Sequence, residues 1–345
     1  MLNILKIRYG GWISENSSDG GDEVMKKKRI ALLTSGGDAP GMNAAIRAVV
    51  RKALYHKFDV VGVNRGYQGL ISGDFSQMEL KSVAGIINRG GTMLKSARSK
   101  EFMTEEGFAT AIRNIKEHNI DAIVVIGGDG SMAGARKLSK AGIPTLVIPA
   151  TIDRDMQGTE YTLGFDTALN TILEAVNKIK DTSFSLDRVA IIEVMGRHAG
   201  HLALMAGIAC GAEIILIPEI AFDIDSICEG LIRSFNRGKQ YSILMMAEGV
   251  GTGSNIAAQI ASRTNFSPSV TVLGYLQRGG TPSAMDNIIG SRMGAAAIDS
   301  IMLDKVNCLI SMQHGDIIAV PYNQITENKM GIDCSLQEMA NIIAI

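Results

Sequence analysis

The sequence has few cysteines and no excess of charge of either sign. Its four cysteines are scattered over 345 residues, with no C-x-x-C pair. This usage is typical of reduced thiols in a cytoplasmic protein and does not favour a disulfide framework. The formal net charge of −1 gives no general attraction to nucleic acid. An anionic ligand would therefore require a local site.

Long apolar runs are missing as well. No stretch reaches about 18 consecutive apolar residues, so we expect no membrane span. Residues 1–25 have neither the apolar run nor the cleavage site of a secretory signal peptide, and we expect a poorly ordered extension there. Because "MKKKRIALLT" begins like a complete protein, Met25 is an alternative natural start. The intact mass of natively expressed protein would identify it.

Aromatic residues make up only 5% of the chain, whereas apolar residues make up 46%. This mixture suits α/β packing better than an all-β sandwich. The length exceeds that of one compact core and suggests two domains. Apolar runs predict strands at 29–34, 58–63, 121–126, 144–149, 189–194, 213–218, 241–247 and 270–275. Amphipathic segments predict helices at 42–54, 107–118, 166–180, 225–237 and 283–302.

These runs are continuously apolar rather than alternating, which is typical of strands whose sheet is covered by helices on both faces. The strand–helix order predicts open, mainly parallel sheets with right-handed crossovers. The expected fold is therefore α/β, with two Rossmann-like three-layer domains. Ligands of such sheets bind at the carboxyl ends of strands.

Two glycine-rich loops follow predicted strands. In "TSGGDAPG", Gly36 and Gly37 let backbone amides approach an anion, with a helix N-terminus behind them. In "IGGDGS", Asp129 stands between Gly128 and Gly130. A tight turn needs glycine but no carboxylate, so this loop indicates a phosphate or metal site. Taken alone, either loop is also compatible with an ordinary strand-to-helix turn.

The segment "PATIDRD" carries Asp153 and Asp155 two residues apart after a predicted strand. Phosphoryl transfer from a nucleotide requires Mg²⁺ bound by oxygen ligands and a base for the acceptor hydroxyl. Two aspartates are the minimal set for these tasks. The alternative is an aspartate-rich turn whose side chains cap backbone amides.

Cations for a transferred phosphoryl group are available at Arg98, Arg188, Arg197 and Arg278. Each alone is more often a surface residue, but Arg197 and Arg278 come just after apolar strands. His198 and His201 are three residues apart without a third ligand, which indicates a helix start rather than a metal site. The P-loop motif and the G-x-G-x-x-G fingerprint are both absent, which excludes an ordinary P-loop enzyme or dinucleotide dehydrogenase.

Six motifs in order resemble the bacterial-type 6-phosphofructokinases: "LLTSGGDAPGMNAAIR", "INRGGTMLKSAR", "VVIGGDGS", "TIDRD", "EVMGRHAGHLAL" and "VLGYLQRGGTPSAMD". The resemblance covers residues 27 to 320. It implies the phosphofructokinase fold, a homotetramer, and transfer of the γ-phosphoryl of MgATP to the 1-hydroxyl of fructose 6-phosphate in glycolysis. The implied domains are an ATP-binding domain at 26–160 with part of the tail 303–345, and a sugar-phosphate-binding domain at 161–302.

The resemblance also implies roles for individual residues. Asp153 is the general base beside Thr151 and Asp155, and Asp129 works with Mg²⁺. The implied catalytic set is Asp153, Thr151, Arg197, Arg98 and Gly36. The implied nucleotide set is Gly36, Gly37, Arg98, Ser99, Gly128, Asp129, Gly130 and Ser131. The implied substrate set is Thr151, Asp153, Asp155, Met195, Gly196, Arg197, Glu248, Tyr275, Arg278 and, from a neighbouring subunit, Arg188.

Donor and effector choices follow from the same resemblance. Gly130 and Ala150 stand where pyrophosphate-using relatives carry Asp and Lys, which implies ATP as the donor. An Asp at position 130 would crowd the nucleotide's α-phosphate. An effector site for ADP or phosphoenolpyruvate between subunits is implied by Arg47, Arg51, Lys180, Glu213, Arg237 and Lys239.

Four positions depart from the family pattern. Arg154 replaces the Asn of T-I-D-N-D, and Ala150 replaces the Gly before Thr151. Tyr275 replaces a His and Ser269 an Arg, both of which help to bind the sugar's 6-phosphate. Losing one charge-assisted arginine contact costs about 1.5–3 kcal/mol, roughly ten- to a hundredfold in affinity. Tyr275 keeps one hydrogen-bond donor, and Arg154 is a candidate for restoring charge.

These departures leave two other functions open. One is a sugar or sugar-phosphate kinase with another acceptor, such as tagatose 6-phosphate or a sugar without the 6-phosphate. The other is a non-catalytic regulatory paralogue, although such a chain need not keep Asp129, Asp153 and Arg197. NAD kinases and lipid kinases also use G-G-D-G loops, but they lack the T-I-D and Q-R-G-G elements.

Overall fold

The computed structural model describes residues 28–186, 188–326 and 330–344. The expected extension at 1–25 and the alternative start at Met25 lie outside these residues. The contacts within the chain divide it into two compact units. The first unit comprises the described residues up to Ala150, then Gly158–Tyr161 and 287–326. The second comprises Thr151–Gln157, Thr162–Asp286 and 330–344.

The first unit is built on a seven-stranded sheet of order β11-β10-β5-β4-β1-β2-β3. Its strands are β1 (Arg29–Ser35), β2 (Asp59–Val63), β3 (Phe75–Gln77), β4 (Ala122–Gly127), β5 (Thr145–Pro149), β10 (Cys308–Gln313) and β11 (Asp316–Pro321). Only β3 and β11 pair antiparallel with their neighbours. Short 3₁₀ turns are η1 (Leu80–Val83), η2 (Glu101–Met103) and η5 (Tyr322–Gln324).

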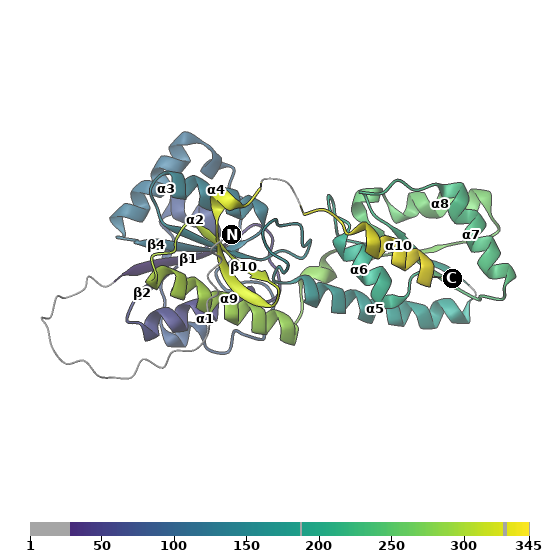
Figure 1. The fold of residues 1–345 in the computed structure, drawn as a ribbon, viewed down its shortest axis with the longest axis horizontal. Coiled ribbons are helices and arrows are strands. Elements are labelled where there is room, and N and C mark those ends of the chain that lie inside the picture. Colours follow the sequence, from purple (N-terminus) through teal and green to yellow (C-terminus); the bar gives the residue numbers. More distant parts are fainter. Residues whose placement is uncertain (1–27, 187, 327–329, 345) are drawn as a thin grey trace, which may run out of the picture. The chain divides into compact units, whose positions relative to one another are not determined.

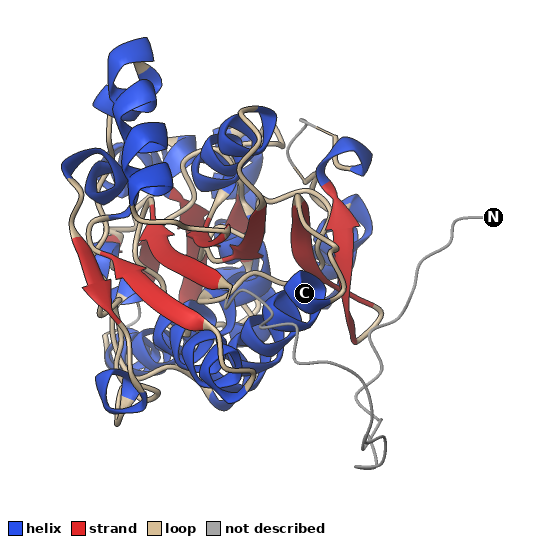
Figure 2. Cartoon of the chain, turned by 90° about the vertical axis from the view of Figure 1, so that its left-hand side faces the viewer, coloured by secondary structure: helices blue, strands red, loops and turns tan. Residues whose placement is uncertain are grey.

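Helices cover both faces of this sheet. On one face lie α1 (Met42–Tyr55) and α9 (Ala284–Met302), and on the other lie α2 (Gly66–Ser72), α3 (Glu105–Glu117) and α4 (Asp129–Lys140) (Figure 1). Figure 2 shows the strands between two layers of helices. Every residue of β4 and β5 is buried, as continuously apolar strands require.

The second unit has a four-stranded parallel sheet of order β7-β8-β6-β9. Its strands are β6 (Val189–Val194), β7 (Ile214–Leu216), β8 (Ser242–Ala247) and β9 (Ser269–Val272). Its helices are α5 (Phe165–Ser185), α6 (His201–Cys210), α7 (Ile224–Asn236), α8 (Gly253–Arg263) and α10 (Cys334–Ile343), with 3₁₀ turns η3 (Glu248–Val250) and η4 (Gly274–Arg278). Helices α5 and α6 lie on one face, α7 and α8 on the other (Figure 1).

The predicted α/β fold with mainly parallel sheets is confirmed, and all eight predicted strands are present. Two of them are shorter than predicted. The run 213–218 gives only β7. The run 270–275 gives β9 followed by the 3₁₀ turn η4, because the backbone takes helical angles from Leu273 (φ −77°, ψ −31°) onward. No helix among the described residues is long and apolar enough to cross a bilayer.

The C-terminal residues divide between the units. Strands β10 and β11 extend the first unit's sheet, whereas α10 packs on α6 in the second. The first unit also takes α9 from Asn287 onward, and the second takes Thr151–Gln157. The ATP-binding and sugar-phosphate-binding labels of the two domains stay predictions.

A fully buried carboxylate lies in the first turn of α9. Asp286 accepts hydrogen bonds from the backbone N–H of Gly164 (2.8 Å) and of Thr167 (2.9 Å), the first turn of α5. The Thr167 hydroxyl donates to the same carboxylate at 2.5 Å. The N-cap of α5 is Gly164, which has no side chain to cap it, so Asp286 supplies the cap from a distant part of the sequence.

Replacing Asp286 with Asn should therefore lower the free energy of unfolding by about 2 kcal/mol, because the amide loses the charge-assisted bonds. Urea unfolding followed by circular dichroism measures this change. Asp225→Asn is the matched control, since it removes an exposed carboxylate whose bond to Arg263 (2.7 Å) contributes less than about 1 kcal/mol. Equal effects of the two variants would contradict the capping role.

The turn from β4 into α4 leaves no room for a side chain at Gly127. A Cβ there would lie 2.4 Å from Ser131 Oγ and 2.5 Å from the Ser35 carbonyl oxygen. At Gly130, three residues on, a Cβ would meet nothing within 4 Å. A side chain therefore does not fit at position 127, whereas one fits at position 130.

We expect Gly127→Ala to destabilise the protein by about 1–3 kcal/mol, the usual cost of overpacking. Gly130→Ala should leave stability unchanged or raise it by up to about 1 kcal/mol, because alanine is the better helix former. Thermal unfolding of both variants beside the parent protein tests the contrast. A Gly127→Ala protein as stable as the parent would show that the turn relaxes freely.

Candidate active site

The first unit brings together the two glycine-rich loops. Strands β1 and β4 pair in parallel with Ser35 opposite Gly127, so the loops that follow them start side by side. Ser131 Oγ donates a 2.9 Å hydrogen bond to the Ser35 carbonyl. Gly36, at φ 86°, has the Ser131 hydroxyl 3.4 Å from where its Cβ would be. The backbone amides of both loops are thus available in one place for a polyanion.

A third segment, residues 89–96, is fixed to the first loop by short polar side chains. Ser96 Oγ donates to the Gly36 carbonyl (2.6 Å), and Thr34 Oγ1 donates to the Lys95 carbonyl (2.9 Å). Asn43 accepts from the Met93 N–H and donates to the Arg89 carbonyl, both at 2.9 Å. Sequence reasoning named none of these three anchors.

The segment held in this way leads directly to Arg98 and Ser99. Arg98 is exposed, so its guanidinium is accessible from solvent. Ser99 instead donates to Gln68 Oε1 (2.7 Å) and accepts from the Phe102 N–H (3.1 Å). Its hydroxyl therefore holds the η2 turn in place.

Asp129 is the first residue of α4 and is half-buried. Gly128 precedes it without a side-chain cap, so backbone N–H groups of the first helical turn face outward. The buried Tyr67 hydroxyl donates to the Ser131 carbonyl at 2.5 Å, and burial raises the pKa of Tyr67 well above its usual value. This contact anchors the helical turn that carries Asp129. Gly37 and Gly130 are both exposed.

Metal binding can be tested against the side chains that the structure describes. Among those residues, no group of three or more His, Cys, Asp or Glu side chains could hold a metal ion. A single carboxylate such as Asp129 fits Mg²⁺ that is held mainly by substrate phosphates and water, as this ion prefers. His201, the first residue of α6, instead has Nε2 at 3.2 Å from the Met330 carbonyl, and burial lowers its pKa.

In the second unit, the aspartates predicted as base and partner lie in a turn held by hydrogen bonds to its backbone. The Asp153 N–H donates to Thr151 Oγ1 (3.2 Å), and Thr162 Oγ1 donates to the Thr151 carbonyl (2.7 Å). The Met330 N–H donates to the Asp155 carbonyl (3.2 Å). The turn is therefore fixed at both ends, and both carboxylates are half-buried.

The same turn shows where Arg154 points. Its backbone has φ 51°, and its guanidinium carbon lies 5.3 Å from the centre of the Phe165 ring. This geometry is a cation–π contact with the first residue of α5.

Three further loops meet at the carboxyl ends of the adjacent strands β8, β6 and β9. The Gly249 N–H donates to the Gly196 carbonyl (3.2 Å), and the Met195 N–H donates to Gln277 Oε1 (3.1 Å). These bonds bring together the segments that carry the predicted substrate residues Met195, Gly196, Arg197, Glu248, Tyr275 and Arg278.

The cationic and polar side chains of these loops differ in exposure. Arg197 and Glu248 are exposed, and Tyr275 is 84% exposed. Arg278 is half-buried, and its Nε has no acceptor among the described residues. Such an unpaired guanidinium N–H is well suited to bind an anionic group.

Arg188 lies elsewhere in the second unit. It directly precedes β6, so it is at the opposite end of the strand from Met195, and it is exposed. Within one chain the structure does not bring Arg188 together with the other predicted substrate residues. Its assignment to a neighbouring subunit's site stays a prediction.

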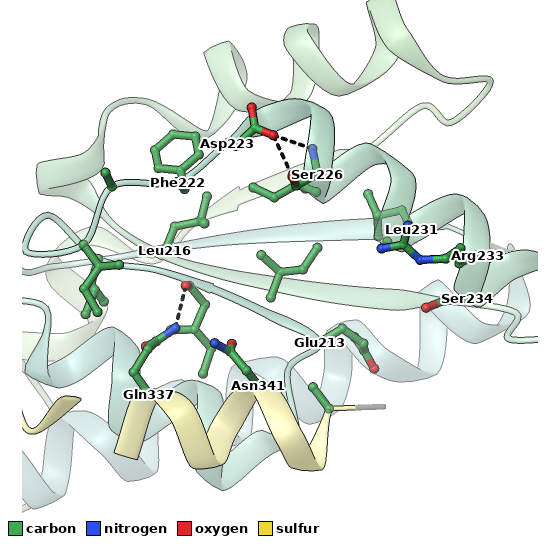
Figure 3. Close-up of a pocket in the computed structure, with 18 of the residues that line it drawn as sticks. Glu213, Leu216, Phe222, Asp223, Ser226, Leu231, Arg233, Ser234, Gln337 and Asn341 are labelled. Atoms are coloured by element: carbon green, nitrogen blue, oxygen red, sulfur yellow. Dashed lines mark hydrogen bonds between the residues drawn. The ribbon is translucent and has the colours of Figure 1, made fainter. Parts of the chain in front are cut away.

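The predicted effector residues of the second unit are engaged with their own unit. Lys239 Nζ pairs with Glu213 Oε1 at 2.6 Å, and the Ile243 N–H donates to the other Glu213 oxygen at 2.5 Å. Lys180 donates to the Cys210 carbonyl. Glu213 and Arg237 line a cavity of about 600 Å³ among β7, α7 and α10 (Figure 3).

Leu216 of β7 and Leu231 of α7 contribute apolar side chains to this cavity, and Gln337 and Asn341 of α10 line it from the opposite side (Figure 3). Arg47 and Arg51, the remaining predicted effector residues, lie on α1 of the first unit. The effector role of the whole set stays a prediction.

Comparison with known proteins gives one consistent result. The model of the family described as phosphofructokinase matches residues 29–301. ATP-dependent 6-phosphofructokinases of Halalkalibacterium halodurans and Shouchella clausii are 50% and 49% identical over 318 residues, covering 92% of this chain and 100% of theirs. A solved phosphofructokinase from Saccharomyces cerevisiae is 34% identical with a TM-score of 0.79, over 92% of this chain and 46% of that one.

A pyrophosphate-dependent phosphofructokinase from Marinobacter aquaeolei shares the fold, with a TM-score of 0.81 over 89% of this chain and 86% of that one, at 22% identity. The matched region includes the glycine-rich loops, the aspartate turn and the three loops of the second sheet. Together with the observed α/β fold, these matches show that the chain belongs to the phosphofructokinase family.

Proposed function

We propose that this chain is an ATP-dependent 6-phosphofructokinase. It transfers the γ-phosphoryl of ATP to the 1-hydroxyl of fructose 6-phosphate and forms fructose 1,6-bisphosphate and ADP. The observation that carries the proposal is the 50% identity to a curated enzyme of this name over that enzyme's full length. The two sets of loops described above supply the residue types that the reaction requires.

The first unit's loops suit the nucleotide. Backbone amides at Gly36, Gly37 and Gly128 bind phosphate oxygens, and the exposed Arg98 reaches the transferred group. Asp129 is the residue that would hold Mg²⁺, which supplies charge neutralisation on the β- and γ-phosphates. The open space at Gly130 supports ATP as the donor, because a side chain there would occupy room next to the phosphates.

The second unit's loops suit the acceptor. Asp153 takes the proton of the 1-hydroxyl as this oxygen attacks phosphorus. Arg197 stabilises the negative charge that develops on the transferred group. Met195, Glu248, Tyr275 and Arg278 bind the sugar phosphate, with Thr151, Asp155 and Gly196 completing the surroundings. Arg278 has the strongest structural support, since its buried Nε lacks an acceptor among the described residues.

A kinase with a different acceptor is the second candidate. Ser269, in β9, is half-buried and carries no charge. Tyr275 projects into solvent. Arg154 stacks on Phe165, so in this conformation its charge is directed toward that ring. Weaker binding of the 6-phosphate than in relatives with Arg and His at these positions is therefore part of the proposal.

The assembly and its regulation are proposed on the resemblance alone. We place the enzyme in the cytoplasm as a homotetramer, in which Arg188 serves the active site of a neighbouring subunit. ADP or phosphoenolpyruvate binds near Glu213, Arg237 and Lys239. Glu213 and Lys239 form an ion pair there, and the remaining N–H donors of the Lys239 ammonium are the groups that suit an anionic effector.

The initial rate of ADP formation with MgATP, measured against fructose 6-phosphate concentration, tests the function. We expect saturation in the millimolar range or below, as is usual for enzymes. Asp153→Asn should lower kcat at least about 100-fold, since it removes the general base, while ATP binding measured by calorimetry stays unchanged. Pyrophosphate in place of ATP should give no rate.

The results of these assays distinguish a 6-phosphofructokinase from a kinase with another acceptor and from a non-catalytic paralogue. A saturable rate only with tagatose 6-phosphate or an unphosphorylated sugar would establish the altered acceptor. No rate with any acceptor, despite ATP binding, would favour a non-catalytic paralogue. Near-normal turnover of Asp153→Asn would remove Asp153 from the base role.

The proposal that the 6-phosphate binds weakly can be tested by placing an arginine at position 269. Ser269→Arg should lower KM for fructose 6-phosphate roughly tenfold, because it adds one charge-assisted contact. Ser269→Gln, which adds length without charge, is the control and should leave KM nearly unchanged. If the arginine variant has the same KM as the parent, position 269 does not contact the phosphate.

A further inference from the structure

A buried glutamine connects two of the loops at the end of the second sheet. Gln277 lies in η4 (Gly274–Arg278) between Tyr275 and Arg278, and it is fully buried with an exposure of 0%. Both ends of its side-chain amide are used. Oε1 accepts from the Met195 N–H at 3.1 Å, and Nε2 donates to the Gly274 carbonyl at 3.0 Å. The side chain therefore joins the loop after β6 to its own turn.

The chemistry of this contact requires an amide. One end must accept and the other must donate at the same time, which glutamine does and an ionised glutamate does not. An apolar side chain of similar size would leave the Met195 N–H and the Gly274 carbonyl without this partner. Buried polar groups without partners are costly, so Gln277 fixes the spacing of the two segments.

The segment on the other side of this contact has little freedom of its own. The Gly249 N–H donates to the Gly196 carbonyl at 3.2 Å, and a Cβ on Gly249 would lie 2.4 Å from the Arg197 carbonyl oxygen. The loops after β6 and β8 are therefore in close backbone contact. The turn η4 is joined to them through the Leu273 N–H, which donates to the Glu193 carbonyl (3.0 Å), and through Gln277.

We propose that Gln277 is a positioning residue for the acceptor. It holds Met195, Gly196 and Arg197 at a fixed distance from Tyr275 and Arg278, and so sets the affinity for the sugar phosphate that these residues contact. The inference rests on the proposed function. Gln277 itself, being fully buried, does not touch the substrate.

Two variants test this role. Gln277→Leu removes both hydrogen bonds and should raise KM for fructose 6-phosphate roughly tenfold, with KM for ATP within about twofold of the parent. Gln277→Glu keeps the acceptor but loses the donor when ionised. Its protonated form both donates and accepts, so the ratio of its KM to that of the parent should fall as the pH is lowered from about 8 to about 6.

A readout independent of catalysis accompanies the kinetics. Amide hydrogen exchange at Met195 should be at least roughly tenfold faster in Gln277→Leu than in the parent, because this N–H loses its acceptor. Gln259, a half-buried glutamine on α8, is the matched control position. Gln259→Leu and Gln259→Glu should leave both KM values and the exchange of Met195 unchanged.

Three results would overturn the inference: a KM for fructose 6-phosphate within about twofold of the parent in Gln277→Leu, equal changes in the two KM values, or unchanged exchange at Met195. A parent protein with no acceptor-dependent rate refutes the proposed function instead. In that case the exchange measurement still decides whether Gln277 ties the two loops together.

Discussion

The parallel pairing of β1 with β4 is the constraint on which the two glycine-rich loops of the first unit depend. Adjacent parallel strands end at the same edge of a sheet, so Ser35 and Gly127 deliver their following loops to one place. Ser131 then joins the loops with a hydroxyl, and Gly127 must lack a side chain for this hydroxyl to fit. The closeness of Gly36 and Asp129, on which their proposed roles depend, is thus a consequence of strand direction and of small residues that allow close approach.

In the second sheet, parallel strands likewise bring their following loops together, but different contacts hold these loops. Strands β8, β6 and β9 bring three loops to one edge, and the contacts that hold these loops differ from the Ser131 hydroxyl bond of the first unit. A buried amide, a backbone hydrogen bond and a glycine without room for Cβ hold these loops instead. The polar residues proposed for the sugar phosphate can therefore be exposed and long, because the backbone beneath them is fixed.

The sequence was sufficient for the fold class, the main strands and the positions of the functional loops, because continuous apolar runs and glycine clusters are local signals. Strands β10 and β11 were not predicted from the sequence. The two residues between them, His314 and Gly315, both have positive φ, which is typical of a two-residue hairpin turn. The roles of Asp286 and Gln277 could not be read at all. Each binds backbone groups more than 80 positions away, and a single sequence does not record which distant segments meet. The direction of Arg154 depends likewise on a ring contributed by α5.

The order in which the sheet of the first unit is assembled follows from the position of β10. This strand pairs with β5 through Cys308 and Leu309, opposite Leu146 and Val147. During synthesis from the ribosome, β5 emerges long before its outer neighbour exists, and the unpaired N–H and C=O groups along its edge, flanked by apolar side chains, are open throughout that time. Open edges of this kind invite pairing with other chains. Nascent protein is therefore most exposed to aggregation while residues 150 to 307 are being made, and a chaperone that shields β5 would act in that interval.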